Sequence, residues 1–143
     1  MKLYRFMSAK EMNQFAKGMT LRNTTNHSIL RGTASTAKGF CFGIGDLAKA
    51  MKDLRRLRGI VNAEMLLVLE PKNISKFAAC QGRYIDYDKI EAEGKTLSNY
   101  PLGKEPSRMF DEYCIESYSI NDVEHIDAIL APSALYLMME NSV

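Results

Sequence analysis

Residues 3–11 read LYRFMSAKE, which predicts a β-strand followed directly by a helix. Side chains alternate along the strand, and the polar Arg5 stands where a strand normally carries an apolar residue. Ser8 and Glu11 have the spacing of a capping box, in which the serine oxygen accepts from the backbone of Glu11 and the glutamate side chain reaches back. We therefore expect a helix that begins after Ser8 and ends near Gly18.

The rest of the chain predicts a second helix and several more strands. An apolar stripe along residues 47–57 indicates a helix, and the continuous apolar run at 65–69 indicates a central strand buried on both faces. Residues 74–80 are compatible with a short helix or with irregular structure. We further expect strands at 19–22, 39–42, 84–87, 109–118 and 126–130, loops at 23–38 and 91–107, and a last short helix after Pro132. This pattern predicts an α+β fold with a largely antiparallel or mixed sheet.

Length and composition favour one globular domain over residues 1–143. Hydrophobic residues make up 46% of the chain and charged residues 25%, enough apolar material for a core. The net charge of +2 does not by itself indicate a nucleic-acid partner. Neither a signal-peptide pattern nor a membrane-spanning apolar run is evident in the sequence, so we expect a soluble cytoplasmic protein without a membrane partner.

The three cysteines argue against two common structural roles. Cys41, Cys80 and Cys114 are odd in number, widely spaced and without a Cys-x-x-Cys motif. This pattern disfavours both a disulfide framework and a zinc site, and we expect no bound metal. Cys41 and Cys114 lie in apolar runs and are expected to be inert core thiols.

Several polar residues near predicted strands are candidates for binding. Arg5 could hold a phosphate or ribose through two parallel hydrogen bonds, or it could be a solvated arginine on an edge strand. The hydroxyls of Ser35 and Thr36 could brace a carboxylate or a ribose, or could satisfy the local backbone. Phe40 could offer a flat face to a nicotinamide or adenine ring.

Glu112 is the candidate catalytic group. It shares a predicted strand face with Glu116, and residues four apart on a strand are separated by about 13 Å, so at most one of them is the working group. A lone carboxylate in an apolar cleft can stabilise a developing cation; the alternative is an exposed charge at a strand end. His27 and Arg31, one helical turn apart in the polar loop, could hold a diphosphate or simply keep the loop soluble.

Residues 47–58 carry a basic helix face that could contact an acidic partner or nucleic acid. Its members are Lys49, Lys52, Arg55, Arg56 and Arg58. Such a face is usually only solvated.

Three segments in a fixed order resemble the ADP-ribosyltransferase superfamily, whose members split NAD. They are Leu3-Tyr4-Arg5 before a capped helix, Lys38-Gly39-Phe40-Cys41-Phe42 before a turn and an Ala- and Lys-rich helix, and Asp111-Glu112-Tyr113-Cys114-Ile115. The resemblance implies a split β-sandwich around an NAD cleft, with two helices of the N-terminal half packed on the sheet.

The resemblance also implies roles for individual residues. Glu112 would bind the nicotinamide ribose 2′-hydroxyl and stabilise the oxocarbenium-like transition state as nicotinamide leaves. The residues expected to bind NAD are Arg5, His27, Arg31, Ser35, Thr36, Gly39 and Phe40. ADP-ribose would pass to a macromolecular acceptor, in the manner of a small toxin, a phage protein or an anti-defence effector.

The chain departs from the family pattern at two positions. Phe110 stands where the arginine-modifying branch carries the first glutamate of Glu-x-Glu, which argues against that branch, and Cys41 stands where many members carry tyrosine, which favours an inactive module. The alternatives are a catalytically inactive module that binds a nucleotide or an NAD derivative, and a protein-interaction inhibitor that uses the basic helix 47–58.

Overall fold

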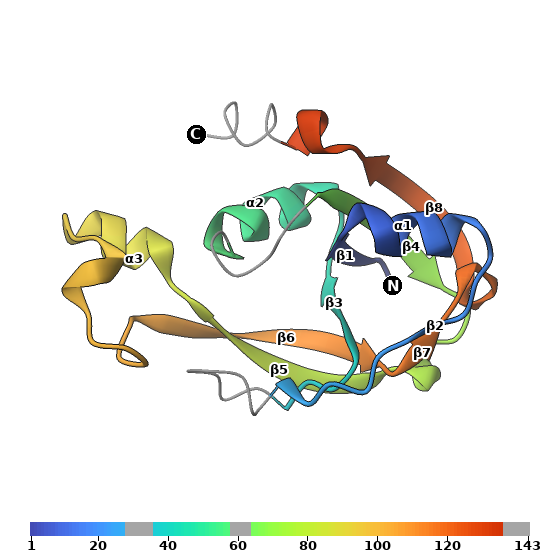
Figure 1. Ribbon diagram of the computed structural model, residues 1–143, viewed down its shortest axis with the longest axis horizontal. Coiled ribbons are helices and arrows are strands. Elements are labelled where there is room, and N and C mark those ends of the chain that lie inside the picture. Colours follow the sequence, from blue (N-terminus) through green and yellow to red (C-terminus); the bar gives the residue numbers. More distant parts are fainter. Residues whose placement is uncertain (28–35, 58–63, 136–143) are drawn as a thin grey trace.

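A computed structural model describes residues 1–27, 36–57 and 64–135 of the chain (Figure 1). Its main feature is a six-stranded sheet with the strand order β5-β6-β3-β1-β4-β8, and each of its strand pairings is antiparallel. A two-stranded antiparallel sheet, β2-β7, accompanies it. The α+β class and the antiparallel sheet predicted from the sequence are therefore confirmed.

The elements follow one another along the chain with these bounds. The strands are β1 (Leu3–Met7), β2 (Leu21–Arg22), β3 (Phe40–Ile44), β4 (Met65–Pro71), β5 (Ala78–Ile85), β6 (Ser107–Ile115), β7 (Ser117–Tyr118) and β8 (Val123–Leu130). The α-helices are α1 (Ala9–Ala16), α2 (Leu47–Leu57) and α3 (Tyr87–Ala92). Short 3-10 helices cover Ile74–Lys76, Leu97–Asn99 and Ile120–Asp122, and residues 132–135 are helical.

The two helices of the N-terminal half cover opposite faces of the sheet. In Figure 1, β1 and β3 pass between α1 and α2. On the α1 side, Met12 and Phe15 of the helix join a core cluster with Phe42 of β3 and Tyr118 of β7. On the α2 side, the apolar stripe packs against the sheet through Ala50, Met51 and Leu54, next to Leu66 and Val68 of β4. Both faces of the sheet are thus buried where these helices lie.

The apolar run at 65–69 is the central strand that the sequence predicts. β4 pairs with β1 on one side and β8 on the other, and Leu66, Leu67, Val68 and Leu69 are each at most 1% exposed. Leu67 and Leu69 belong to the core cluster on the α1 side, and Leu66 and Val68 belong to the cluster on the α2 side. A strand buried on both faces needs apolar side chains at every position, which explains the run.

Other boundaries differ from the sequence prediction. β5 is longer than the strand expected at 84–87, and Asp86 caps helix α3, which the sequence analysis did not foresee, so the expected loop at 91–107 begins within a helix. The expected strand at 109–118 is divided into β6 and β7. Half of the loop predicted at 23–38, residues 28–35, lies outside the described residues.

The expectation that the cysteines form no disulfide was wrong. Cys80 and Cys114 are joined by a disulfide, with Cα atoms 6.6 Å apart. They lie 34 residues apart in sequence and meet because β5 pairs with β6, where Ala78 is opposite Cys114. This proximity depends on strand pairing, which a count of cysteines does not reveal.

Among the described residues, no helix is both long enough and apolar enough to cross a membrane.

Candidate functional site around Glu112

Glu112 lies in the middle of β6 and on the α2 side of the sheet. It is opposite Gly43 of β3, which in turn is opposite Tyr4 of β1. On its other side β6 places it opposite Cys80 of β5. Its exposure is 7%, so it is not the exposed strand-end charge that the sequence left as an alternative. A carboxyl group buried this deeply needs a partner or a function.

Only one of the two Glu112 carboxyl oxygens has a partner among the described residues. Oε1 accepts a hydrogen bond from the hydroxyl of Tyr84 in β5. Oε2 is buried and has no hydrogen-bond partner in the described part of the chain. Gly82 makes room for this arrangement: a Cβ atom there would lie 2.8 Å from Oε2 and 2.9 Å from Cε2 of the Tyr84 ring. A buried acceptor without a partner is unusual and is consistent with a ligand site.

The surroundings hold Glu112 partly protonated near neutral pH. Burial raises its pKa to about 7 from the ordinary 4.5, while the Tyr84 hydrogen bond and the positive charge of Arg5 act to lower it and the negative charge of Asp53 adds to the rise. Burial is the largest cause that raises the pKa of Tyr84, and the charge and hydrogen bond of Glu112 add to it. Tyr84 therefore remains a hydrogen-bond donor. A carboxyl group with a raised pKa in such surroundings is a common mark of a functional site.

A second polar group lies between β1 and α2 on the same side of the sheet. The hydroxyl of Tyr4 donates to Oδ2 of Asp53, a residue only 4% exposed. Nζ of Lys49 lies 2.7 and 2.6 Å from the two oxygens of the same carboxylate. The Tyr4 ring lies across Gly43, where a Cβ atom would be 2.2 Å from Cζ of the ring. Glycine at this position therefore allows Tyr4 to reach Asp53.

Aromatic rings and cations complete this part of the molecule. The rings of Tyr84 and Phe110 are 5.5 Å apart. Lys49 Nζ and Arg108 Cζ each lie 5.8 Å from the centre of the Phe110 ring. Two carboxyl groups, two tyrosine hydroxyls, an aromatic ring that could serve as a platform and two cations thus gather on the α2 side of the sheet.

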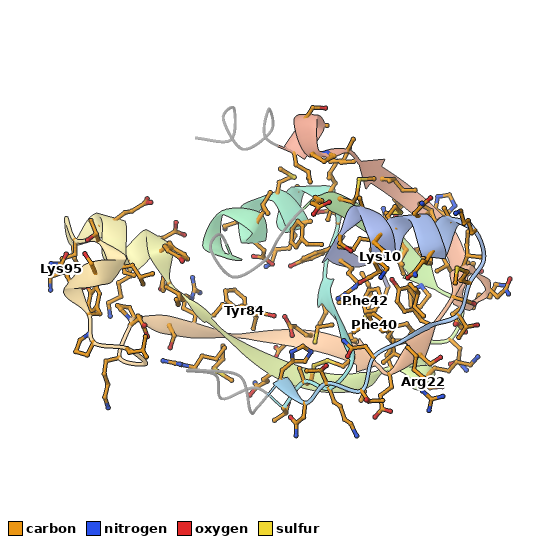
Figure 2. The ribbon with its side chains drawn as sticks, in the orientation of Figure 1. Lys10, Arg22, Phe40, Phe42, Tyr84 and Lys95 are labelled. Atoms are coloured by element: carbon orange, nitrogen blue, oxygen red, sulfur yellow. A yellow bond between two sulfur atoms is a disulfide. The ribbon has the colours of Figure 1, made fainter. Side chains whose placement is uncertain are left out.

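Arg5, the first candidate NAD ligand, lies on the opposite face of the sheet from Glu112. The β1–β3–β6 register puts Tyr4, not Arg5, in line with Glu112. Figure 2 shows Phe40 and Phe42 on the α1 side, apart from Tyr84, and the Arg5 guanidinium lies 5.0 and 5.7 Å from the centres of those phenylalanine rings. The structure therefore brings Arg5 and Phe40 together but does not bring either of them to the face that carries Glu112.

Arg5 is bound by other groups of the protein, in contacts that link β1, α1 and β3. Its Nε and Nη2 donate to the two Glu11 carboxylate oxygens at 2.6 and 2.8 Å, and Nη1 donates to the carbonyl oxygen of Cys41 at 3.0 Å. Tyr118 also donates to Glu11, at 2.8 Å. Burial acts to lower the pKa of Arg5, but the hydrogen bond and charge of Glu11, together with smaller effects of Tyr118 and Cys41, raise it overall. Ser8 caps α1 as predicted, whereas the Glu11 side chain pairs with Arg5 and Tyr118 in place of the predicted reach back to the cap.

Three of the residues expected to bind NAD, His27, Thr36 and Gly39, instead make contacts that position the segment leading into β3. Nε2 of His27 lies 2.8 Å from the carbonyl oxygen of Gly39. Gly39 has a φ of +86°, and a Cβ atom there would lie 2.5 Å from the carbonyl oxygen of Ile115, so the position requires glycine. Thr36 is paired with Gln81 of β5, through its backbone N–H at 3.0 Å and its hydroxyl oxygen at 2.9 Å. The Thr36 hydroxyl thus satisfies a backbone N–H, but one of the distant strand β5 and not of its own loop. Arg31 and Ser35 lie outside the described residues.

Glu116 lies outside this site, and the basic helix face contributes Lys49 to it. Glu116 follows the end of β6, its side chain is 47% exposed, and it pairs with Lys38 at 3.1 Å. Of the two glutamates, Glu112 is thus the buried one. On the basic face, Lys49 is paired with Asp53 and Lys52 is exposed.

A hollow of about 400 Å³ lies elsewhere, where β4 and β8 meet the start of α2. Its lining residues are Lys2, Asp46, Leu47, Ala48, Val68, Asp127 and Ala128. None of the groups around Glu112 contributes to it, and Lys2 is already paired with Asp127 at 3.4 Å. We therefore place the candidate site at Glu112, where buried polar groups converge.

The polar neighbours of Glu112 were not predicted from the sequence. Tyr84 lay only within the strand expected at 84–87, and Asp53 was not among the candidate residues. A signal for Asp53 was present: it follows Ala50 by three residues and Lys49 by four, at the border of the apolar stripe. Tyr84 gave no comparable signal, because its proximity depends on the pairing of β5 with β6. No protein-family model, curated protein or solved structure matches this chain.

Proposed function

We propose that this chain is an ADP-ribosyltransferase-like protein that binds NAD on the α2 side of its sheet and uses Glu112 to assist loss of nicotinamide. The observation that carries the proposal is the buried Oε2 of Glu112, which has no partner among the described residues while Oε1 is held by Tyr84. A single oriented carboxylate in an apolar setting suits the stabilisation of an oxocarbenium-like transition state.

The proposed reaction uses Glu112 in its ionised form. The bond between nicotinamide and ribose breaks with its electron pair leaving on nicotinamide, and a nucleophile of the acceptor then forms the new bond at the same ribose carbon. The Glu112 carboxylate accepts a hydrogen bond from the 2′-hydroxyl and stabilises the positive charge. Since the pKa of Glu112 is about 7, the carboxylate becomes the main form only above neutral pH.

The residues around Glu112 take supporting roles in this proposal. Tyr84 orients the carboxyl group, and Phe110 supplies the aromatic surface for a ring of the ligand. Lys49, whose side chain is 42% exposed, and Arg108, which also lies over the Phe110 ring, are cations on this face that could meet a phosphate. Arg5 is a positioning residue, because it ties α1 to the backbone of β3 at Cys41.

A catalytically inactive nucleotide-binding module is the second candidate. The commitment of Arg5 to Glu11 favours it, because the arginine that the resemblance assigns to NAD is bound within the protein. Cys41 at the position of the family tyrosine favours it as well. Such a module would bind NAD or a derivative without releasing nicotinamide.

One experiment separates these functions. We would measure the thermal midpoint with NAD and then nicotinamide release, with a cell lysate as acceptor source, for wild type and Glu112→Gln. Glu116→Gln is the matched control, because Glu116 is exposed and outside the site. Transferase function predicts a shift in all three proteins and release that only Glu112→Gln loses. A shift without release indicates the binding module, and neither shift nor release overturns both functions.

A further inference from the structure

The three cysteines of the chain meet on the α2 face of the sheet, although they come from three different strands. Cys41 of β3 is directly opposite Cys114 of β6, and Cys114 is joined by the disulfide to Cys80 of β5. The sulfur of Cys41 lies 3.4 Å from the sulfur of Cys114. Cys41 is a free thiol, so a thiol lies in contact with a disulfide.

This geometry is that of thiol–disulfide exchange, in which a sulfur attacks one atom of an existing disulfide. We propose that Cys41, Cys80 and Cys114 form an intramolecular exchange centre in which Cys114 alternates between Cys80 and Cys41. One isomer holds the Cys80–Cys114 disulfide with Cys41 free. The other holds a Cys41–Cys114 disulfide with Cys80 free.

The step balances without an external oxidant or reductant. The sulfur of Cys41 forms a bond to the sulfur of Cys114, the bond between Cys114 and Cys80 breaks, and its electron pair leaves on Cys80. The proton of the Cys41 thiol passes to Oε2 of Glu112 and then to the Cys80 thiolate. The relevant donor atoms of Cys41, Glu112 and Cys114 lie within 4.8 Å of one another, and Cys80 is opposite Glu112 in the register.

Burial keeps this exchange within the protein. Cys80 and Cys114 are 8% and 4% exposed, so a thiol in solution has poor access to their disulfide, whereas Cys41 is half-buried and already in contact with it. Burial, followed by the charge of Glu112, raises the pKa of the Cys41 thiol to about 12. The thiolate is therefore scarce at neutral pH, and the exchange is slow.

The same cluster is not a metal site in this disulfide-bonded form. Two of its sulfurs are joined to each other, and a disulfide sulfur is not the thiolate that a zinc ion requires. The exchange centre depends only on the disulfide, the adjacent thiol and the neighbouring carboxyl group. It shares Glu112 with the proposed NAD chemistry, but it requires neither bound NAD nor release of nicotinamide.

The test is disulfide mapping on the whole chain. Oxidised wild type would be quenched in acid, alkylated at its free thiols in denaturant and mapped by mass spectrometry. We expect two isomers, one with Cys41 alkylated and one with Cys80 alkylated. Cys80→Ser should form a Cys41–Cys114 disulfide when oxidised in the same buffer, and Cys41→Ser should keep the Cys80–Cys114 disulfide as the matched control.

The outcome that overturns the proposal is equally specific. If Cys41 and Cys114 are both alkylated in folded Cys80→Ser, and wild type shows no alkylated Cys80, no exchange centre exists. Cys80→Ala serves as a second variant should the serine destabilise the core, with the thermal midpoint as the check on folding. If no Cys80 variant folds, the presence or absence of alkylated Cys80 in wild type decides alone.

Discussion

Tyr84 donates a hydrogen bond to one oxygen of Glu112, while the other oxygen is buried over Gly82 without a partner among the described residues. The pair joins neighbouring strands, β5 and β6, on the face covered by α2. The hydrogen bond orients the carboxyl group and opposes the effect of burial on its pKa. The site is thus a carboxyl group held in one orientation with half of its acceptor capacity unused.

The first prediction is that protein stability falls as pH rises from about 4.5 to about 7. The pKa of Glu112 is about 7 in the folded protein, against an ordinary 4.5, so the folded state holds the proton more tightly than the unfolded chain. Stability from this group is full below pH 4.5 and is lost as pH rises to about 7, by about 3 kcal/mol in total. Urea unfolding of wild type and Glu112→Gln across this range should show the loss in wild type alone. An equal slope in both proteins would contradict the prediction.

The second prediction concerns the donor to Glu112. Tyr84→Phe removes the hydrogen bond that lowers the Glu112 pKa, so the pH-dependent loss of stability should extend above pH 7. Above that pH the variant should be less stable than wild type by about 1–3 kcal/mol, the cost of an ionised buried carboxylate that has lost its donor. Tyr100→Phe is the matched control, because it removes an exposed tyrosine hydroxyl that donates to Glu93. If both variants behave alike, Tyr84 does not govern Glu112.

The third prediction is that Arg5 stabilises the folded protein and does not bind NAD. Arg5→Met leaves the Glu11 carboxylate without its two-point partner and should lower the free energy of unfolding by about 3 kcal/mol. Lys38→Met breaks the exposed pair with Glu116 and should cost less than about 1 kcal/mol. Denaturant unfolding of both variants gives the comparison. Loss of NAD affinity in Arg5→Met with unchanged stability would show that Arg5 is a ligand and would contradict this assignment.

The fourth prediction concerns close packing of Tyr4 on Gly43. Gly43→Ala places a Cβ atom 2.2 Å from the Tyr4 ring, which must move away from Asp53. The expected loss of stability is about 1–3 kcal/mol. Adding Tyr4→Leu should relieve the clash, so that the double variant loses less than the sum of the two single variants. Additive losses in thermal unfolding would contradict this contact.

Local sequence patterns were sufficient to predict much of the fold. The stripe at 47–57 coincides with α2, and the apolar run at 65–69 lies within the buried strand β4. Ser8 caps α1 as expected. These elements follow from periodicity and capping, which depend on residues close together in the chain.

The candidate site was only partly predictable, because its partners are distant in sequence. The alternation along β1 separates Arg5 from Tyr4, but which of the two shares a face with Glu112 depends on the β1–β3–β6 register. The Tyr84–Glu112 pair and the disulfide between Cys80 and Cys114 both depend on the pairing of β5 with β6. Strand register follows from contacts across the whole sheet, which periodicity does not specify.

The most direct test of the central claim is the pH dependence of nicotinamide release from NAD. If the ionised Glu112 carboxylate assists this step, the rate in wild type should rise about tenfold between pH 6 and pH 8, as the carboxyl group ionises with a pKa of about 7. Glu116→Gln should follow the same curve, and Glu112→Gln should show no release at any pH. Release in Glu112→Gln at the wild-type rate would contradict the claim.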